Sequence, residues 1–269
     1  TPPGRDGEVV ISVSNNKLDF ESSTTFFRYA DLPVIGMVSH RNVSMSGNST
    51  VVVNGVGFTG DDSMSCLFQY YDELAKKNVS QIVMVKSQNN TSLECNAPTI
   101  NPGDALEAAA TLSISRNSQE FSSPYEMRYI RRPKLTGVFP KHIQPGLLSI
   151  VNITGGKFVN TFDLFCHYSG GIPSHRAVFV SETELRCGVF IPLSWDTFHS
   201  EITIRVTNNI QEMSLEKLRI RVLATPKVLL YSPRLGSENG HTAVKIKGSG
   251  FSMNNYTCEF GNVLVPGEW

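Results

Sequence analysis

The sequence has few charged residues and lacks any long apolar run. Charged residues make up 18% of the 269 residues, and 24 Lys and Arg balance 24 Asp and Glu. This balance argues against a nucleic-acid-binding protein, which needs a concentrated excess of basic residues. No segment reaches the about 18 consecutive apolar residues of a membrane-spanning helix, and residues 1–7 lack the apolar core of a signal peptide. We therefore expect no nucleic acid partner and no membrane segment, in a chain cut from a longer protein.

Motifs of catalytic and cofactor sites are also missing from the sequence. The six histidines are scattered, and none belongs to a His-Glu-x-x-His metal motif. Residues 155–157 look like the end of a phosphate-binding loop, but Val151 and Phe158 stand where that motif requires Gly and Ser or Thr. Asp61 and Asp62 are a lone acidic pair, more typical of a solvated loop than of a calcium site with six or more oxygen ligands. We expect no enzyme activity, no cofactor and no metal site.

An internal repeat organises the chain. Its opening element is Pro followed by apolar residues, at 33–38, 133–140 and 226–233. The second element is an apolar stretch that ends in Gly and Phe, at 51–58, 150–158 and 243–251. The closing element alternates apolar and polar residues and ends in Asn, at 9–16, 112–117 and 202–209. An apolar residue follows each closing element, and Asn tolerates the positive φ of tight turns, so this element predicts a β-hairpin.

The repeat predicts the domain organisation. The opening prolines are 100 and 93 residues apart, and 21 Gly and 14 Pro indicate a folded chain rich in turns. We expect 1–31 to be the last strands of a truncated repeat, 32–131 and 132–224 to be complete repeats, and 225–269 to be the first strands of another. This predicts an all-β fold of tandem immunoglobulin-like β-sandwiches, arranged as beads on a string. Only 70–77 has a helical pattern, with acid-to-Lys pairs at i,i+4.

The five cysteines occupy corresponding positions in the repeats. Cys66 and Cys95 lie in the first complete repeat, Cys166 and Cys187 in the second, and Cys258 in the last, incomplete one. One pair per complete repeat predicts the disulfides Cys66–Cys95 and Cys166–Cys187, with the partner of Cys258 outside this chain. Disulfides indicate an oxidising compartment. Buried free thiols are the alternative, and a zinc site is less favoured because the sequence has no Cys-x-x-Cys.

The acceptor pattern for N-linked glycans, Asn-x-Ser/Thr, points to the same compartment. It occurs at Asn42, Asn48, Asn78, Asn89, Asn90, Asn152 and Asn255. Asn152 corresponds to Lys245, which lies between apolar residues, so we expect the Asn152 side chain to point to solvent. We therefore expect a glycoprotein of the secretory pathway, extracellular or at the cell surface.

The order of the repeat elements resembles that of the IPT/TIG domain. After the Gly and Phe of the second element come a Cys, then Ser-Leu-Glu-Cys at 92–95 or Glu-Leu-Arg-Cys at 184–187, then the Asn hairpin. The resemblance covers the whole chain and implies an immunoglobulin-like sandwich in each repeat. The family occurs in the extracellular stalks of plexins, in surface adhesins and in Rel-type transcription factors. Paired cysteines and glycan acceptors resemble the extracellular branch, which implies repeats of a large cell-surface protein.

Two segments are candidates for binding a protein partner. The first predicted disulfide spans 29 positions and the second 21, and the extra length coincides with the segment around 70–78. Extra loops on a sandwich are where recognition surfaces are usually built, although a neutral surface insertion is the alternative. The candidate residues in this segment are Tyr70, Tyr71, Asp72 and Glu73.

The second candidate is a basic cluster at the junction of the complete repeats. It consists of Arg128, Arg131, Arg132 and Lys134. Such a cluster could bind a sulfated glycan or an acidic partner, but a solvated strand between domains is the favoured interpretation. Lys217, Arg219 and Arg221 alternate with apolar residues, which predicts simply the outward face of a strand.

These features predict a non-enzymatic segment of a cell-surface glycoprotein that mediates adhesion or recognition through protein contacts, homophilic or heterophilic. A structural spacer in a receptor stalk or extracellular filament is the second hypothesis. An accessory carbohydrate-binding module is the third, and for this Trp195 is the one Trp inside a complete repeat.

Overall fold

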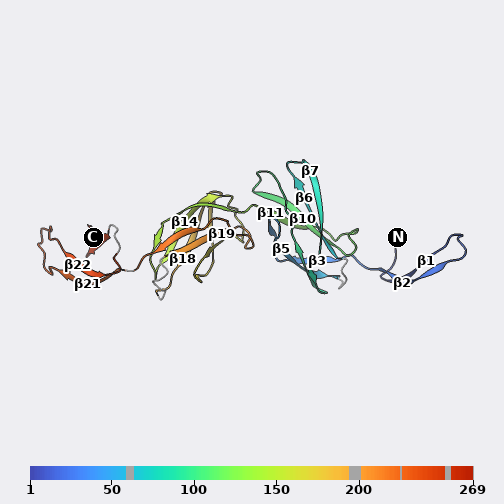
Figure 1. Ribbon diagram of the computed structural model, residues 1–269, viewed down its shortest axis with the longest axis horizontal. Coiled ribbons are helices and arrows are strands. Elements are labelled where there is room, and N and C mark those ends of the chain that lie inside the picture. Colours follow the sequence, from blue (N-terminus) through green and yellow to red (C-terminus); the bar gives the residue numbers. More distant parts are fainter. Residues whose placement is uncertain (59–63, 194–200, 225, 252–255, 269) are drawn as a thin grey trace. The chain divides into compact units, whose positions relative to one another are not determined.

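The computed structural model describes residues 1–269 except 59–63, 194–200, 225, 252–255 and 269. Asp61, Asp62, Trp195 and the acceptor Asn255 therefore lie outside the described residues. The described chain contains 24 β-strands and no helix. It divides into two compact units, which we call the first unit, Thr1–Arg132, and the second unit, Pro133–Trp269 (Figure 1). The further repeat boundaries near 31 and 224 stay predictions.

The first unit contains one β-sandwich, the first sandwich. Its four-stranded sheet has the order β3 (Val34–Val38), β5 (Thr50–Val56), β9 (Ser92–Asn96), β8 (Ser87–Gln88). Its five-stranded sheet has the order β4 (Asn42–Ser44), β11 (Tyr125–Ile130), β10 (Glu107–Ser115), β6 (Ser65–Asp72), β7 (Lys77–Met84). All neighbours are antiparallel except β4 and β11, which are parallel.

The second unit repeats this topology in the second sandwich. Its four-stranded sheet has the order β12 (Lys134–Phe139), β14 (Leu148–Gly156), β18 (Glu184–Phe190), β17 (Val178–Ser181). Its five-stranded sheet has the order β13 (His142–Ile143), β20 (Leu218–Val222), β19 (Glu201–Thr207), β15 (Phe165–Tyr168), β16 (His175–Arg176). Here β13 and β20 are the parallel pair. The chain is thus an all-β array of immunoglobulin-like sandwiches.

Three two-stranded sheets complete the two units. In the first unit β1 (Gly7–Val13) pairs with β2 (Glu21–Tyr29), in the same antiparallel way as β10 pairs with β11 and β19 with β20. In the second unit β21 (Lys227–Ser232) pairs with β22 (Lys245–Ser249), and β23 (Tyr256–Phe260) with β24 (Val263–Gly267). The hairpin predicted from the closing element is confirmed in all three copies.

Alternation of side chains builds each core between its two sheets. In the first sandwich Val51 and Val53 of β5 face Leu112 and Ile114 of β10, all of them fully buried. In the second sandwich Ile202, Ile204 and Val206 of β19 are fully buried in the corresponding layer. Buried aliphatic side chains supply the main stabilisation of such a fold, while the alternate positions face outward.

One disulfide crosses each core. Cys66 of β6 bonds to Cys95 of β9, and Cys166 of β15 bonds to Cys187 of β18. Each bond joins the five-stranded sheet to the four-stranded sheet, and all four cysteines are fully buried. Cys258 in β23 is a free thiol.

The repeated Gly and Phe of the second element have a steric role. A Cβ on Gly55, Gly155 or Gly248 would overlap the carbonyl oxygen of a residue in the preceding strand. It would also come within 2.9 Å of the ring of the Phe that follows three residues later. All three strand pairs have a bulge next to this approach. Only Gly lets the two backbones and the ring come this close.

The Asn of the closing element caps the hairpin turn with its side chain. The Oδ1 of Asn209 accepts the backbone N–H of Glu212 (2.9 Å) and a hydrogen bond from Thr207 Oγ1 (3.2 Å). Asn16 and Asn117 accept the corresponding backbone N–H groups. The positive φ, expected at the Asn itself, falls on the following residue: Lys17 (66°), Ser118 (58°) and Ile210 (63°). The Asn is therefore needed as an acceptor.

Replacing Asn209 by alanine is expected to lower the free energy of unfolding of the second unit by about 1–2 kcal/mol. Asn209 is buried, so the N–H of Glu212 and the hydroxyl of Thr207 would lose their acceptor without gaining water. Chemical denaturation followed by circular dichroism measures the change. Asn160→Ala, at an exposed position of the same sandwich, is the control and should change the free energy by less than about 0.5 kcal/mol. Equal effects of the two variants would contradict the capping role.

The helix predicted for 70–77 is wrong. The segment is instead the end of β6, a turn and the start of β7. Pairing over eight residues between these strands, with aromatic side chains that favour strands, outweighs the local acid-to-Lys pairs. Asp72 Oδ1 accepts the backbone N–H groups of Leu74 and Ala75, both at 2.9 Å, and so stabilises the turn.

Candidate recognition surfaces

The β6–β7 hairpin of the first sandwich presents one row of side chain pairs to solvent. On the outward side Leu67 lies opposite Ile82, Gln69 opposite Ser80 and Tyr71 opposite Asn78, and the exposed Met84 follows opposite the buried Ser65. We call this surface the hairpin face; its residues are Leu67, Gln69, Tyr71, Ser80, Ile82 and Met84. None of these six residues carries a charge at neutral pH.

Large apolar side chains on the hairpin face are exposed. Ile82 is 52% exposed and Met84 55% exposed, and Tyr71 is also exposed. On the inward side of β7 Val79 and Val83 pack against the core, so both faces of this strand carry apolar side chains. Ile82 and Met84 were not predicted from the sequence. The apolar residues of 77–84 stand at 79 and 82–84, so they do not alternate with polar residues, and no pattern there separates the outward Ile82 and Met84 from the inward Val83.

The structure separates the four predicted residues of this segment. Tyr70 points inward: it is 7% exposed, its ring centre lies 6.0 Å from that of Tyr129, and its hydroxyl accepts a hydrogen bond from Gln81. Tyr70 is therefore a core residue, and its prediction as a partner contact is wrong. Asp72 holds the turn, and Glu73 forms an exposed ion pair with Lys76 (3.0 Å). Tyr71 alone of the four lies on the hairpin face.

Structural contacts occupy part of the basic cluster predicted at 128–134. Arg128 pairs with Glu107 at 2.9 Å across β10 and β11. The guanidinium of Arg131 donates to the backbone carbonyls of Gly103 and Ala105, and thereby anchors that loop. Arg132 is half-buried and Lys134 exposed, but they belong to different units. Because Arg128 and Arg131 are held by these structural contacts, we do not propose a binding site at the basic cluster.

The described glycan acceptors differ in accessibility. Asn42 is 6% exposed in β4, so a glycan there is incompatible with this fold, and its prediction as a glycosylation site is corrected. Asn48, Asn78, Asn89 and Asn90 are exposed. Asn152 is half-buried and lies on the outward side of β14, between the buried Val151 and Ile153. These five positions remain predicted glycosylation sites.

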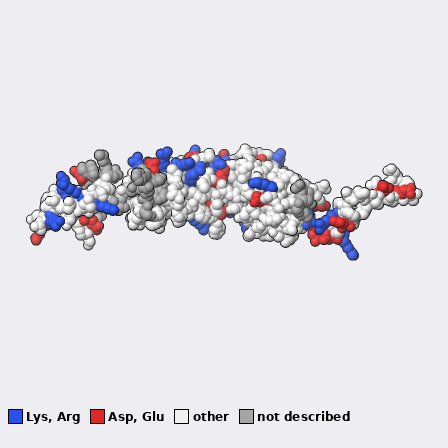
Figure 2. All heavy atoms as spheres, turned by 60° about the horizontal axis from the view of Figure 1, so that its bottom comes forward, with Lys and Arg blue, Asp and Glu red and all other residues white. Residues whose placement is uncertain are grey.

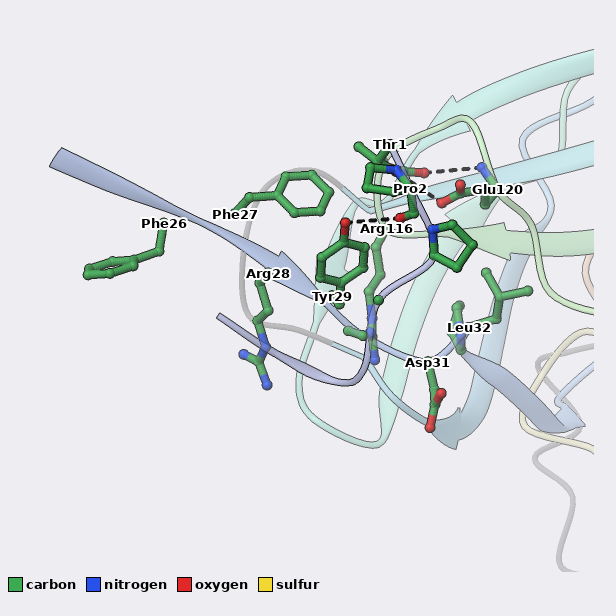
Figure 3. A pocket seen from close by; sticks show the side chains of 15 residues that line it. Thr1, Pro2, Phe26, Phe27, Arg28, Tyr29, Asp31, Leu32, Arg116 and Glu120 are labelled. Carbon is green, nitrogen blue, oxygen red and sulfur yellow. Dashed lines mark hydrogen bonds between the residues drawn. The ribbon is translucent and has the colours of Figure 1, made fainter. Parts of the chain in front are cut away.

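A hollow of about 920 Å³ lies in the first unit beside β2 (Figure 3). Residues 1–4 and 26–33 line it together with Arg116, Asn117 and Glu120. Polar side chains that line the hollow already bind the backbone. The Tyr29 hydroxyl donates to the carbonyl of Pro2 (3.0 Å), and Arg116 Nε donates to the carbonyl of Gly57 (2.7 Å). We place no binding or reaction there.

Two further features bear on chemistry. Within the described part of the chain, no three His, Cys, Asp or Glu side chains are grouped so that they could hold a metal ion. Burial lowers the pKa of His167, whose Nδ1 lies 2.8 Å from Ser174 Oγ, so this imidazole is neutral at neutral pH. The residues that the structure describes also form no helix long and apolar enough to cross a membrane.

Comparisons with known proteins find likeness at the level of fold. No protein-family model and no curated protein matches the chain. The full extracellular region of plexin A4, domains 1 to 10, is 13% identical with a TM-score of 0.46, over 98% of this chain and 21% of that chain. A second plexin A4 structure, with domains 1 to 8, is 12% identical with a TM-score of 0.32, over 81% and 28%.

The FN1-FN3 domains of chicken CNTN1 are also 12% identical, with a TM-score of 0.32, over 80% of this chain and 76% of that chain. This chain thus spans about a fifth of the plexin A4 extracellular chain. At these identities and TM-scores the likeness concerns the β-sandwich fold alone.

Proposed function

We propose that the chain is a non-enzymatic segment of an extracellular cell-surface protein, and that it mediates recognition or adhesion through protein contacts made by the hairpin face. The observation that carries this proposal is the exposure of Ile82 and Met84 on an uncharged sheet surface. Exposed apolar side chains that gather on one surface of a folded domain are typical of interaction sites.

The disulfides support the extracellular part of the proposal. Two buried disulfides at corresponding positions are a stable feature of domains that fold in an oxidising compartment. The exposed acceptors Asn48, Asn78, Asn89 and Asn90 are accessible to N-linked glycans of the same compartment. A glycan on Asn78 would sit at the turn end of the hairpin. Met84 lies roughly 20 Å along the strand from that end, so it would stay open.

The hairpin is an elaboration of the first sandwich. Its edge strand β7 has eight residues, whereas the corresponding edge strand β16 of the second sandwich has two. Among the described strands β7 pairs with β6 alone and lies at the edge of its sheet, so its other edge offers backbone N–H and C=O groups to a partner. An exposed edge next to exposed apolar side chains can bind an extended segment of another protein.

Bead aggregation tests the proposal. Beads coated with the disulfide-intact, glycosylated chain are expected to clump, either with each other or with beads that carry a cell-surface partner. A variant with Ile82→Glu and Met84→Glu should reduce clumping by about tenfold or more, because it places charge on the apolar surface. The matched control is Val178→Glu with Val180→Glu, which changes two exposed apolar residues on edge strand β17 of the second sandwich.

If the control variant reduces clumping as much as the hairpin-face variant does, the assignment of binding to the hairpin face is wrong. Beads that stay dispersed, alone and with every candidate partner, would favour the spacer hypothesis. Clumping that soluble oligosaccharides compete away would favour the carbohydrate-binding hypothesis.

A further inference from the structure

The five-stranded sheet of the second sandwich has an unusual charge balance. Its strands β13, β15, β16, β19 and β20 contain four arginines and a single acidic residue, Glu201. The four arginines are Arg176, Arg205, Arg219 and Arg221. The strands of the other sheet in the same sandwich contain Lys134, Arg186 and Glu184, a nearly even balance. In Figure 2 blue side chains gather along the upper rim of the second sandwich.

All four arginines lie on the outward side of this sheet. On β19 Ile202, Ile204 and Val206 are buried, so Arg205 faces outward between them. Arg219 and Arg221 flank the buried Ile220 on β20. Arg176 lies opposite Phe165, whose neighbour Cys166 faces the core. The side chains thus share one surface, although they are up to 45 positions apart in the sequence.

The strand register sets the arginines along a diagonal. Arg176 is on β16, two strands from Arg205 on β19, and Arg219 and Arg221 follow on the next strand, β20. With strands about 4.8 Å apart and residues about 3.4 Å apart, the band is on the order of 25 Å long. We call these four residues the arginine band.

Local contacts position the side chains of the arginine band. Arg205 Nε donates to the carbonyl of Ser214 (3.0 Å), which fixes the side chain through one of its three nitrogens. The ring of Phe162 lies 4.7 Å from the guanidinium carbon of Arg176. Glu201 lies 3.4 Å from Arg219 and 3.7 Å from Arg221, so one carboxylate is shared between two guanidinium groups. Both arginines remain mostly exposed, and exposed pairs of this kind are weak.

We propose that the arginine band binds a sulfated glycan chain of the glycosaminoglycan type. A guanidinium group makes paired hydrogen bonds to the oxygens of a sulfate and is weakly hydrated, which favours Arg over Lys at such sites. A band of this length along one sheet face suits an extended polyanion, whereas a compact anion would need a convergent pocket. This binding goes beyond the proposed protein contacts and does not depend on them.

The described glycan acceptor of the second sandwich does not lie on the sheet that carries the arginine band. The described acceptor of the second sandwich, Asn152, lies on β14 of the opposite sheet. His167 lies opposite Arg205 in the register, and its neutral imidazole adds no charge at neutral pH, so the arginines carry the attraction.

Heparin binding by the whole chain tests the proposal. Immobilised heparin is the probe, and Arg219→Gln with Arg221→Gln is the variant, because both side chains are exposed and only Glu201 would lose its partners. We expect the variant to weaken binding by about tenfold or more, and to reduce the slope of log K against log salt by about one for each guanidinium–sulfate pair removed. Lys134→Gln with Arg186→Gln removes the same charge from the opposite sheet and should change affinity less than about twofold.

Three outcomes would overturn the proposal. Equal weakening by the two variants would mean that heparin binds exposed basic side chains in general and not the arginine band. Equal affinity for heparin stripped of its sulfates would exclude sulfate recognition. Equal affinity for poly-glutamate would indicate an acidic protein as the partner. The variant with Ile82→Glu and Met84→Glu should bind heparin normally, so this test and the bead test succeed or fail separately.

Discussion

Replacing Gly155 by alanine is expected to lower the free energy of unfolding of the second unit by about 3 kcal/mol. The added Cβ would overlap the carbonyl oxygen of Lys134 and lie 2.8 Å from the ring of Phe158. The carbonyl belongs to β12, which pairs with β14 at this point, so it cannot withdraw without breaking the strand pairing. Phe158 is buried in the core and has no room to move. Both obstacles must therefore strain the fold.

Gly156→Ala is the matched control for this prediction. It is the next residue of the same strand, and a Cβ there would meet nothing within 4 Å. The control should change the free energy of unfolding by less than about 1 kcal/mol, or raise it slightly, since alanine restricts the unfolded chain more than glycine. Chemical denaturation and native-state hydrogen exchange of the second unit measure both variants. Similar losses for the two would show that the close approach at Gly155 is not what stabilises this strand pair.

Removing the disulfide of the second sandwich, by Cys166→Ala with Cys187→Ala, is expected to cost about 3 kcal/mol. The bond closes a loop with a sequence separation of 21, and its loss frees the unfolded chain. Cys166 on β15 and Cys187 on β18 also link the two sheets of this sandwich covalently. Both side chains are fully buried, so small cavities add to the loss.

Denaturation with and without a reducing agent measures this effect. The unchanged chain should lose stability on reduction, and the double variant should lose less because one of its two disulfides is already gone. Cys258→Ser is the control, since this thiol is free, and it should leave the response to reduction unchanged. Thiol titration of the denatured, unreduced chain should find one free thiol. Five free thiols would contradict both disulfides.

Cross-strand pairing explains why the helix predicted for 70–77 does not form. The acid and Lys residues there have the spacing of a helical surface, and that pattern is local. Tyr70 buries its ring beside Tyr129, which is 59 positions away in the sequence, and β6 pairs with both β7 and β10. Such distant contacts override local propensity, and no pattern within eight residues reports them.

Contacts between residues distant in the sequence also decide which glycan acceptors are accessible and which arginines share a surface. The acceptor motif at Asn42 is complete in the sequence, yet β4 lies against β11 and buries the side chain. The sequence predicts Arg219 and Arg221 on the outward face of one strand, which is correct for β20 by itself. The band arises because Arg205 and Arg176 lie on other strands of the same sheet face. Strand order in the sheet was needed to join them.

The sequence by itself determined the all-β architecture, the hairpins and the recurring cysteine and glycine positions. The strands follow from the alternation of apolar and polar residues with a period of two. The cysteines and glycines recur at the same place in each repeat because no other residue can form the disulfide or fit the close approach there. The tertiary structure alone decided which outward side chains share a surface: Ile82 and Met84 beside Leu67, and the arginine band across three strands. The reason is physical, because a strand's own sequence sets which residues face outward, whereas its neighbours in the sheet are chosen by packing and chain connection over the whole sandwich.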